Sequence, residues 1–264
     1  MEDARIRLYL TRPRSLTQIL PFLHNLGLEV LDQRPFELRR GGQELFLYDL
    51  GVKFPGSVDP EGTSGLLADA FTAAMRGDIE SDRIDALVIR ERLAWRQAAI
   101  LRSYAKYLQQ LGTTNSYGFI ADTLISNVRA TRALLALFQA KFDPGLDEPD
   151  RGRNTAGAKK ELLAAIDDIP VLDADRLLRT FMNLVEATTR TNYFQGKAHL
   201  SFKLNPAAIA GAPFPRPKYE IWVYSPRVEG VHLRFGTWRA GVCAGLTEAR
   251  ISGPRSWDWS RHKT

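Results

Sequence analysis

Few side chains in this sequence have the types and spacings that a catalytic or metal site requires. His24 lies in a segment with the apolar spacing of an amphipathic helix, and a surface or boundary position accounts for it. His199 and His232 fall in two separate predicted strands. A metal site there would need a carboxylate ligand, which the sequence does not identify. We therefore predict no metal site.

Arginine is the other candidate for recognition chemistry. Arg227 and Arg234 flank the segment VEGVHL, and either could bind a carboxylate through paired N–H groups or simply lie exposed on a strand. The segment RTNYF, at 190–194, is interpreted as a helix end followed by an asparagine turn, which needs no ligand. Cys243 has no histidine or helix start beside it, so we interpret it as an inert thiol.

Motifs that hold cofactors do not occur in the sequence. It contains no glycine-rich nucleotide or phosphate loop, no C-x-x-C and no H-E-x-x-H. We therefore predict that this chain has no catalytic, cofactor-binding or metal-binding residue. Pattern alone identifies no substrate-binding residue either.

The composition predicts a soluble globular protein of the cytoplasm. Hydrophobic residues make up 44% of the 264 residues and charged residues 25%. No apolar run approaches the roughly 20 residues of a membrane helix. The start, MEDARIRLYL, lacks the regions of a signal peptide, and the single cysteine fits a reducing compartment. Residues 237–264 supply +3 of the net charge of +6, and the other basic clusters are short, so we expect no membrane or nucleic-acid partner.

A small β-α-β-β unit is predicted in residues 4–54. RIRLYL alternates with the period of a strand, and a helix follows from its N-cap Ser15 to a C-terminal glycine, Gly27. Two further strands, LEVLDQRPFELRR and ELFLYDLGV, are joined by Gly41 and Gly42, which is a hairpin signal. The unit therefore combines three strands with one helix.

Helical spacing dominates the middle of the chain, and strand-like sequence follows it. The expected helices cover 64–77, 84–112, 116–127, 129–142, 159–169 and 173–189, with Asp173 as the cap of the last one. The polar, Gly- and Pro-rich residues 143–157 are expected to form a flexible connection. Strands are expected at 198–206, 219–226 and 228–236, in an antiparallel or mixed sheet. The predicted fold class is α+β.

Several phrases of the sequence resemble the large bacterial NAD-specific glutamate dehydrogenases. They are LRSYAKYLQQLG, LFQAKFDP, ATTRTNYFQ, LSFKLNP and YEIWVYSPRVEGVHLRFG, in this order. The N-terminal RLYLTRPRSLTQILPFLHNLGLEVLDQRPFEL is similar to the ACT-type module of that family. The resemblance implies an ACT-like module at 1–58, a helical region at 64–195 and the first strands of the catalytic domain at 196–236.

The resemblance also implies an activity for the whole enzyme. Family members oxidise L-glutamate to 2-oxoglutarate and ammonia with NAD as cofactor, and the full-length enzyme self-associates. The catalytic lysine and the nucleotide-binding domain lie downstream of the resembling segments. We therefore expect this chain to bind no NAD and to be inactive by itself. The alternative is a regulatory ACT-type module that binds amino acids or joins subunits.

The resemblance ends at Gly236, where the family continues with a motif of the form VARGGLRWSDR. Residues 237–264 instead contain three of the five tryptophans and show no sustained period. Permitted codons for these residues, read in a shifted frame that begins within the Thr237 codon, can spell VARGGLRWSDRGEDFRTEVLGLVKAQD. We therefore predict that 237–264 is a frameshifted reading of the dehydrogenase gene and that it is disordered, because it buries too little apolar surface to offset its chain entropy.

Overall fold

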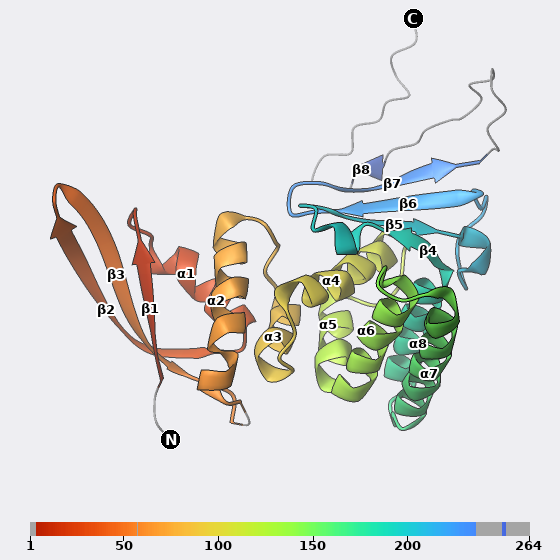
Figure 1. The fold of residues 1–264 in the computed structure, drawn as a ribbon, viewed down its shortest axis with the longest axis horizontal. Coiled ribbons are helices and arrows are strands. Elements are labelled where there is room, and N and C mark those ends of the chain that lie inside the picture. The colour runs from red at the N-terminus through yellow and green to blue at the C-terminus, as the bar shows by residue number, and fades with distance from the viewer. Residues whose placement is uncertain (1–3, 57, 236–249, 252–264) are drawn as a thin grey trace, which may run out of the picture. The chain divides into compact units, whose positions relative to one another are not determined.

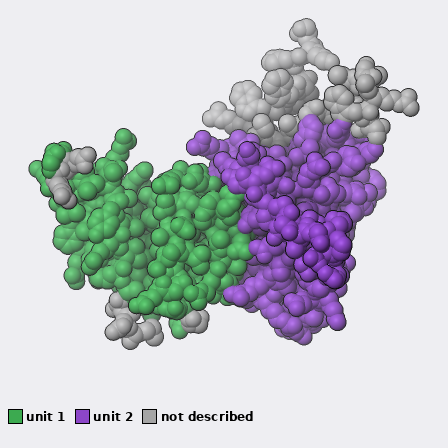
Figure 2. Space-filling view, viewed as in Figure 1, with its two compact units in different colours: residues 1–99 green, residues 100–264 purple. Residues whose placement is uncertain are grey.

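The structure, a computed structural model, describes residues 4–56, 58–235 and 250–251. It divides into two compact units, one of residues 1–99 and one of residues 100–264 (Figure 2). Of the tail, 237–264, the structure describes Arg250 and Ile251 alone, so Cys243 lies outside the described residues. The disorder predicted for the tail concerns residues that the structure does not describe. The predicted α+β class is confirmed, because helices and two antiparallel sheets are both present.

Unit 1 contains a three-stranded antiparallel sheet. Its strands are β1 (Ala4–Leu10), β2 (Glu29–Arg40) and β3 (Gln43–Lys53), in the order β1-β3-β2. Gly41 and Gly42 form the predicted hairpin turn and have φ angles of 56° and 82°. Both angles are in the left-handed region, which suits the twist of a two-residue hairpin and favours glycine.

Two helices of unit 1 lie on one side of this sheet (Figure 1). The first, α1 (Leu16–Asn25), begins after the predicted cap Ser15 and is followed by Gly27, which has a φ of 85°. The second, α2 (Pro60–Arg76), starts earlier than the predicted residue 64. Its N-cap is Asp59, whose carboxylate accepts from the N–H groups of the first turn.

The core of unit 1 is formed by apolar side chains from both helices and the sheet. Buried members from α1 and β3 include Ile19, Leu23, Leu50 and Val52. Phe71 of α2 packs edge-on against Phe22 of α1, with ring centroids 6.1 Å apart. The predicted β-α-β-β order is confirmed, and α2 extends the unit beyond it.

The long helix predicted at 84–112 is divided into separate helices. A short 3₁₀ turn, Arg83–Asp85, leads into α3 (Ala86–Arg90), and α4 (Trp95–Gln110) begins after a break. Arg92 has a φ of 53° within this break and donates to the Gly62 carbonyl at 2.7 Å. The sequence did not reveal the break, because the apolar spacing continues across it without Gly or Pro.

Unit 2 contains four further helices. These are α5 (Tyr117–Ser126), α6 (Val128–Phe142), α7 (Glu148–Asp167) and α8 (Leu172–Ala187). The prediction of a connection over 143–157 was wrong, because α7 begins at Glu148. Asp147 caps this helix by accepting from the Asp150 N–H at 2.9 Å, and its buried Leu162 and Ile166 anchor it.

The last helix and the strand after it also differ from the prediction. The N-cap of α8 is Val171, and Asp173 lies in the first turn, where a carboxylate interacts favourably with the helix dipole. The helix ends at Ala187 and β4 (Thr188–Thr191) follows, so the helical interpretation of RTNYF was wrong. β4 is specified by pairing with a distant strand, which local periodicity cannot show.

Five antiparallel strands form the sheet of unit 2. They are β4, β5 (Leu200–Leu204), β6 (Tyr219–Tyr224), β7 (Glu229–Arg234) and β8 (Arg250–Ile251), in sequence order across the sheet. The strands expected near 198–206, 219–226 and 228–236 are confirmed, and the sheet is antiparallel throughout. Helices cover one face of it, and the other face points away from them (Figure 1).

An aromatic layer joins the covered face of the sheet to the helices of unit 2. Phe202 of β5 stacks on Tyr104 of α4, with ring centroids 4.6 Å apart and an interplanar angle of 16°. Phe138 of α6 packs edge-on against both rings. Trp222 of β6 donates its indole N–H to the carbonyl and hydroxyl of Ser103, each at 3.0 Å. These contacts fix the position of the sheet on α4.

Removing the centre of this layer should destabilise unit 2. We expect Phe202→Ala to lower the free energy of unfolding by about 3–5 kcal/mol, because the cavity forfeits packing on two rings. Urea-induced unfolding followed by tryptophan fluorescence measures the change. Phe214→Ala is the matched control, since Phe214 is 83% exposed. Equal changes in unfolding free energy for the two variants would contradict the packing described.

Candidate functional site

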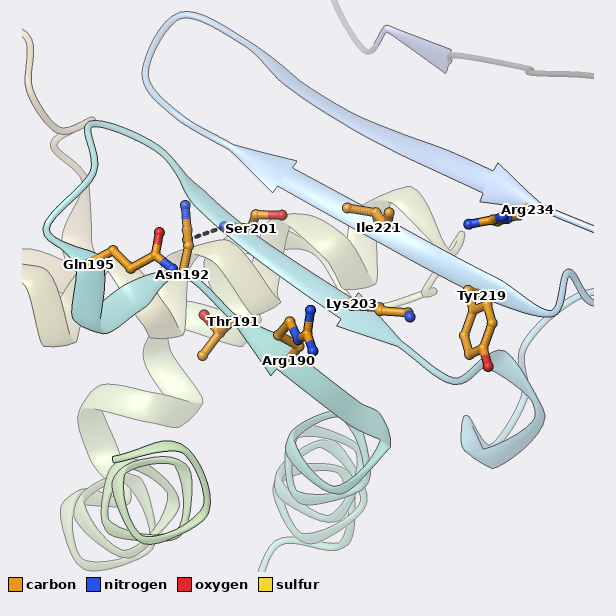
Figure 3. Close-up of a pocket in the computed structure, with 9 residues that line it drawn as sticks. All are labelled: Arg190, Thr191, Asn192, Gln195, Ser201, Lys203, Tyr219, Ile221 and Arg234. Atoms are coloured by element: carbon orange, nitrogen blue, oxygen red, sulfur yellow. Dashed lines mark hydrogen bonds between the residues drawn. The ribbon is translucent and has the colours of Figure 1, made fainter. Parts of the chain in front are cut away.

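A cleft with a volume of about 340 Å³ lies on the uncovered face of the unit 2 sheet (Figure 3). Nine of the described residues line it; three of them are cations, Arg190 of β4, Lys203 of β5 and Arg234 of β7, and none of the nine is acidic. The other lining residues are neutral: Thr191, Asn192, Gln195, Ser201, Tyr219 and Ile221. The cleft therefore presents positive charge and hydrogen-bonding groups to solvent.

The strand register places the cations. Arg190 is the direct cross-strand partner of Lys203, and Arg234 is the partner of Tyr219. Direct partners in an antiparallel pair point to the same face of the sheet. Lys203 and Tyr219 are also close, because the Lys203 ammonium lies 4.0 Å from the centre of the Tyr219 ring. Figure 3 shows Lys203 between Arg190 and Tyr219.

One end of the cleft is held by the turn between β4 and β5. The Asn192 side chain donates to the His199 carbonyl at 3.0 Å and accepts from the Ser201 N–H at 2.8 Å. Thr191 accepts from the Tyr193 N–H through its hydroxyl at 3.1 Å. These bonds connect the two strand ends, so the residues that follow Arg190 have a defined backbone position.

A buried carboxyl group lies on the opposite side of the sheet from the cleft, on the face of β6 that the helices cover. Glu220 of β6 is 7% exposed and accepts a short hydrogen bond from the Tyr107 hydroxyl of α4. Burial raises the pKa of Glu220 above its usual value, and the Tyr107 bond partly opposes this. Burial also raises the pKa of Tyr107, and the neighbouring Glu220 raises it further. The pair therefore keeps its protons more readily than it would in water.

The structure brings together only part of what the sequence suggested. Arg234 lies in the cleft, whereas Arg227 is exposed in the turn between β6 and β7 and does not line it. His24 is exposed on α1, as expected. His199 is exposed and precedes β5 instead of lying in it, and His232 is exposed on β7.

Sequence reasoning missed Arg190 and Lys203. The signal that could have found them is the pairing of their strands, which brings the two cations opposite each other. Among the described residues, no group of three His, Cys, Asp or Glu side chains could hold a metal ion. Within the same part of the chain, no helix is both long and apolar enough to cross a membrane.

Comparison with protein families gives three matches that follow one another along the chain. Residues 1–63 match the ACT3 domain of glutamate dehydrogenase, and residues 79–144 match its helical motif 3. Residues 161–245 match the catalytic domain of bacterial NAD-glutamate dehydrogenase. The chain is related to the bacterial NAD-specific glutamate dehydrogenases. The resemblance noted in the sequence is therefore confirmed.

Individual relatives agree with these matches. The chain is 40% identical over 235 residues to the NAD-specific glutamate dehydrogenase of Pseudomonas aeruginosa and 42% identical over 240 residues to that of Mycobacterium tuberculosis. The Halomonas elongata enzyme is 39% identical over 232 residues. Each comparison covers 85% of this chain but only 14–15% of the relative. The chain thus spans about one seventh of the dehydrogenases that it matches.

The buried carboxyl of Glu220 should make stability depend on pH. When folding raises the pKa of a group, that group stabilises the fold at low pH. This contribution is lost as the pH rises from the group's pKa in the unfolded chain through its pKa in the folded chain. Glu220→Gln stays neutral at every pH, and the amide oxygen can still accept from Tyr107. We expect the variant to gain unfolding free energy relative to the native chain as the pH rises above 4.5. Urea midpoints measured over a pH series test this, and a gain that shrinks with rising pH would contradict it.

Proposed function

We propose that this chain is part of a bacterial NAD-specific glutamate dehydrogenase of the cytoplasm. The whole enzyme converts L-glutamate, NAD⁺ and water to 2-oxoglutarate, ammonia and NADH. The observation that carries the proposal is the order of the three matches, with an ACT3 domain, helical motif 3 and the catalytic domain on one chain. Residues 1–58 serve as the ACT-like module, and residues 196–236 supply the first strands of the catalytic domain.

The described residues do not fit an NAD site. Nucleotide-binding α/β units place the pyrophosphate where a parallel strand leads into a helix N-terminus. Both described sheets of this chain are antiparallel, and the sequence has no glycine-rich loop of that kind. We therefore assign no step of hydride transfer to these residues. In the proposed enzyme, other parts of the protein hold the cofactor and carry the catalytic lysine.

The isolated 264-residue chain should not catalyse the reaction. Hydride transfer requires the nicotinamide to be held against the substrate carbon in a water-excluding site. We expect no NADH formation, followed by absorbance, when purified chain is mixed with L-glutamate and NAD⁺. The P. aeruginosa relative is the positive control. Turnover above the background rate would show that these residues contain a complete active site.

A change of reading frame after Gly236 is the proposed origin of residues 237–264. The proposal is supported by the genetic code, because permitted codons for these residues, read in a shifted frame, can spell the family motif VARGGLRWSDR. The match to the catalytic domain ends at residue 245, so the DNA must be read across the codons from 236 to 245. Insertion or deletion of a single base that restores the motif supports the proposal. Codons that cannot spell the motif in either shifted frame overturn it.

A regulatory role for the N-terminal module is the second candidate. The match to an ACT3 domain over residues 1–63 and the β-α-β-β order of unit 1 favour it. Calorimetric titration of the chain with the common amino acids tests this role. Saturable heat with one amino acid supports a regulatory site, and no heat with any of them contradicts ligand binding by the module.

A further inference from the structure

We propose that the cleft on the uncovered face of the unit 2 sheet binds a small molecule with two anionic oxygen groups. The proposal concerns a site that the dehydrogenase assignment does not include, and it does not depend on that assignment. It rests on the placement of three cations, Arg190, Lys203 and Arg234, around one cavity.

The placement of these cations lowers the stability of the sheet. Like charges that face each other directly on neighbouring strands destabilise a sheet. Arg190 and Lys203 occupy such positions, and among the described residues no carboxylate lines the cleft around them. The Lys203 ammonium is balanced in part by the Tyr219 ring, but a ring face offsets only a fraction of a charge. An anion bound between the two cations would remove the repulsion.

The positive charges lie at two separate places across the sheet. Arg190 and Lys203 are on adjacent strands, whereas Arg234 is on β7, two strands beyond Lys203. Strands are about 4.8 Å apart, so the backbone positions of Lys203 and Arg234 are separated by roughly 10 Å across the sheet. Ile221 and Tyr219 lie on the intervening strand. A ligand with an anionic group at each end and a short middle section suits this arrangement.

The side chains of the lining have the chemistry to bind anionic oxygen atoms. Arginine donates two parallel N–H bonds to a carboxylate or a phosphate, and lysine adds a compact charge. Thr191, Gln195 and Ser201 supply neutral hydrogen-bonding groups on the same lining. The volume of about 340 Å³ is at the lower end of the range for small-molecule sites. Dicarboxylates and pyrophosphate share this chemistry, and titration can separate them.

Calorimetry on the full 264-residue chain tests the proposal with two probes, succinate and inorganic pyrophosphate, each without NAD. We expect saturable binding of at least one probe, and the stronger of the two identifies the ligand class. Arg190→Gln and Arg234→Gln should each weaken that binding about tenfold, because each removes a charge-assisted hydrogen bond. Circular dichroism confirms that the variants remain folded.

Arg227→Gln is the matched control. Arg227 is an exposed arginine in the turn between β6 and β7, outside the cleft, so its loss should leave the affinity unchanged. Failure of both probes to bind the native chain would overturn the proposal. An equal loss of affinity in the Arg227 variant would also overturn it, because attraction to the general positive charge would then explain the binding. Neither result would bear on the proposed dehydrogenase function.

Discussion

Tyr104, Phe202 and Trp222 meet where the sheet of unit 2 rests on α4, and the arrangement of that unit depends on this contact. Phe202 stacks on Tyr104, and Trp222 is tied to the Ser103 backbone by its indole N–H. Interior side chains are packed as densely as organic crystals, so a sheet held in this way cannot slide by one residue without losing every ring contact. The aromatic layer therefore fixes which side chains point to solvent.

The two faces of β6 illustrate this consequence. Glu220 and Trp222 point to the helices, while Tyr219 and Ile221 line the cleft. A shift of one residue would bury the cleft lining and expose Trp222. The buried Glu220 tolerates its position because the Tyr107 hydroxyl donates to it. The strand register fixed by the aromatic layer therefore determines both the packing on one face and the grouping of cations on the other.

Much of the fold could be predicted from local sequence. The hairpin at Gly41 and Gly42 and the turn after α1 at Gly27 depend on glycines in the left-handed region, which leave a clear sequence signal. The start of α7 was missed because the polar sequence that follows Asp147 favoured a connection, even though Asp147 can cap a helix. The buried residues of that helix begin only near Leu162. Tertiary contacts, which local patterns do not contain, decided that case.

The cleft could be predicted only in part. Arg234 was recognised as a candidate, because a strand arginine can bind an anion. Arg190 and Lys203 were missed, since each is unremarkable within its own segment and they meet only through the pairing of β4 with β5. The family could be recognised from sequence phrases alone, and the two relatives are 40% and 42% identical to the chain.

The central physical claim is that strand pairing holds Arg190 and Lys203 opposite each other at a cost in stability. A double-mutant cycle with Arg190→Gln and Lys203→Gln, measured as unfolding free energy in low salt without added anions, tests it most directly. We expect an unfavourable coupling of a few tenths to about 1 kcal/mol that declines as salt is added. Additive effects of the two substitutions, or a favourable coupling, would contradict it.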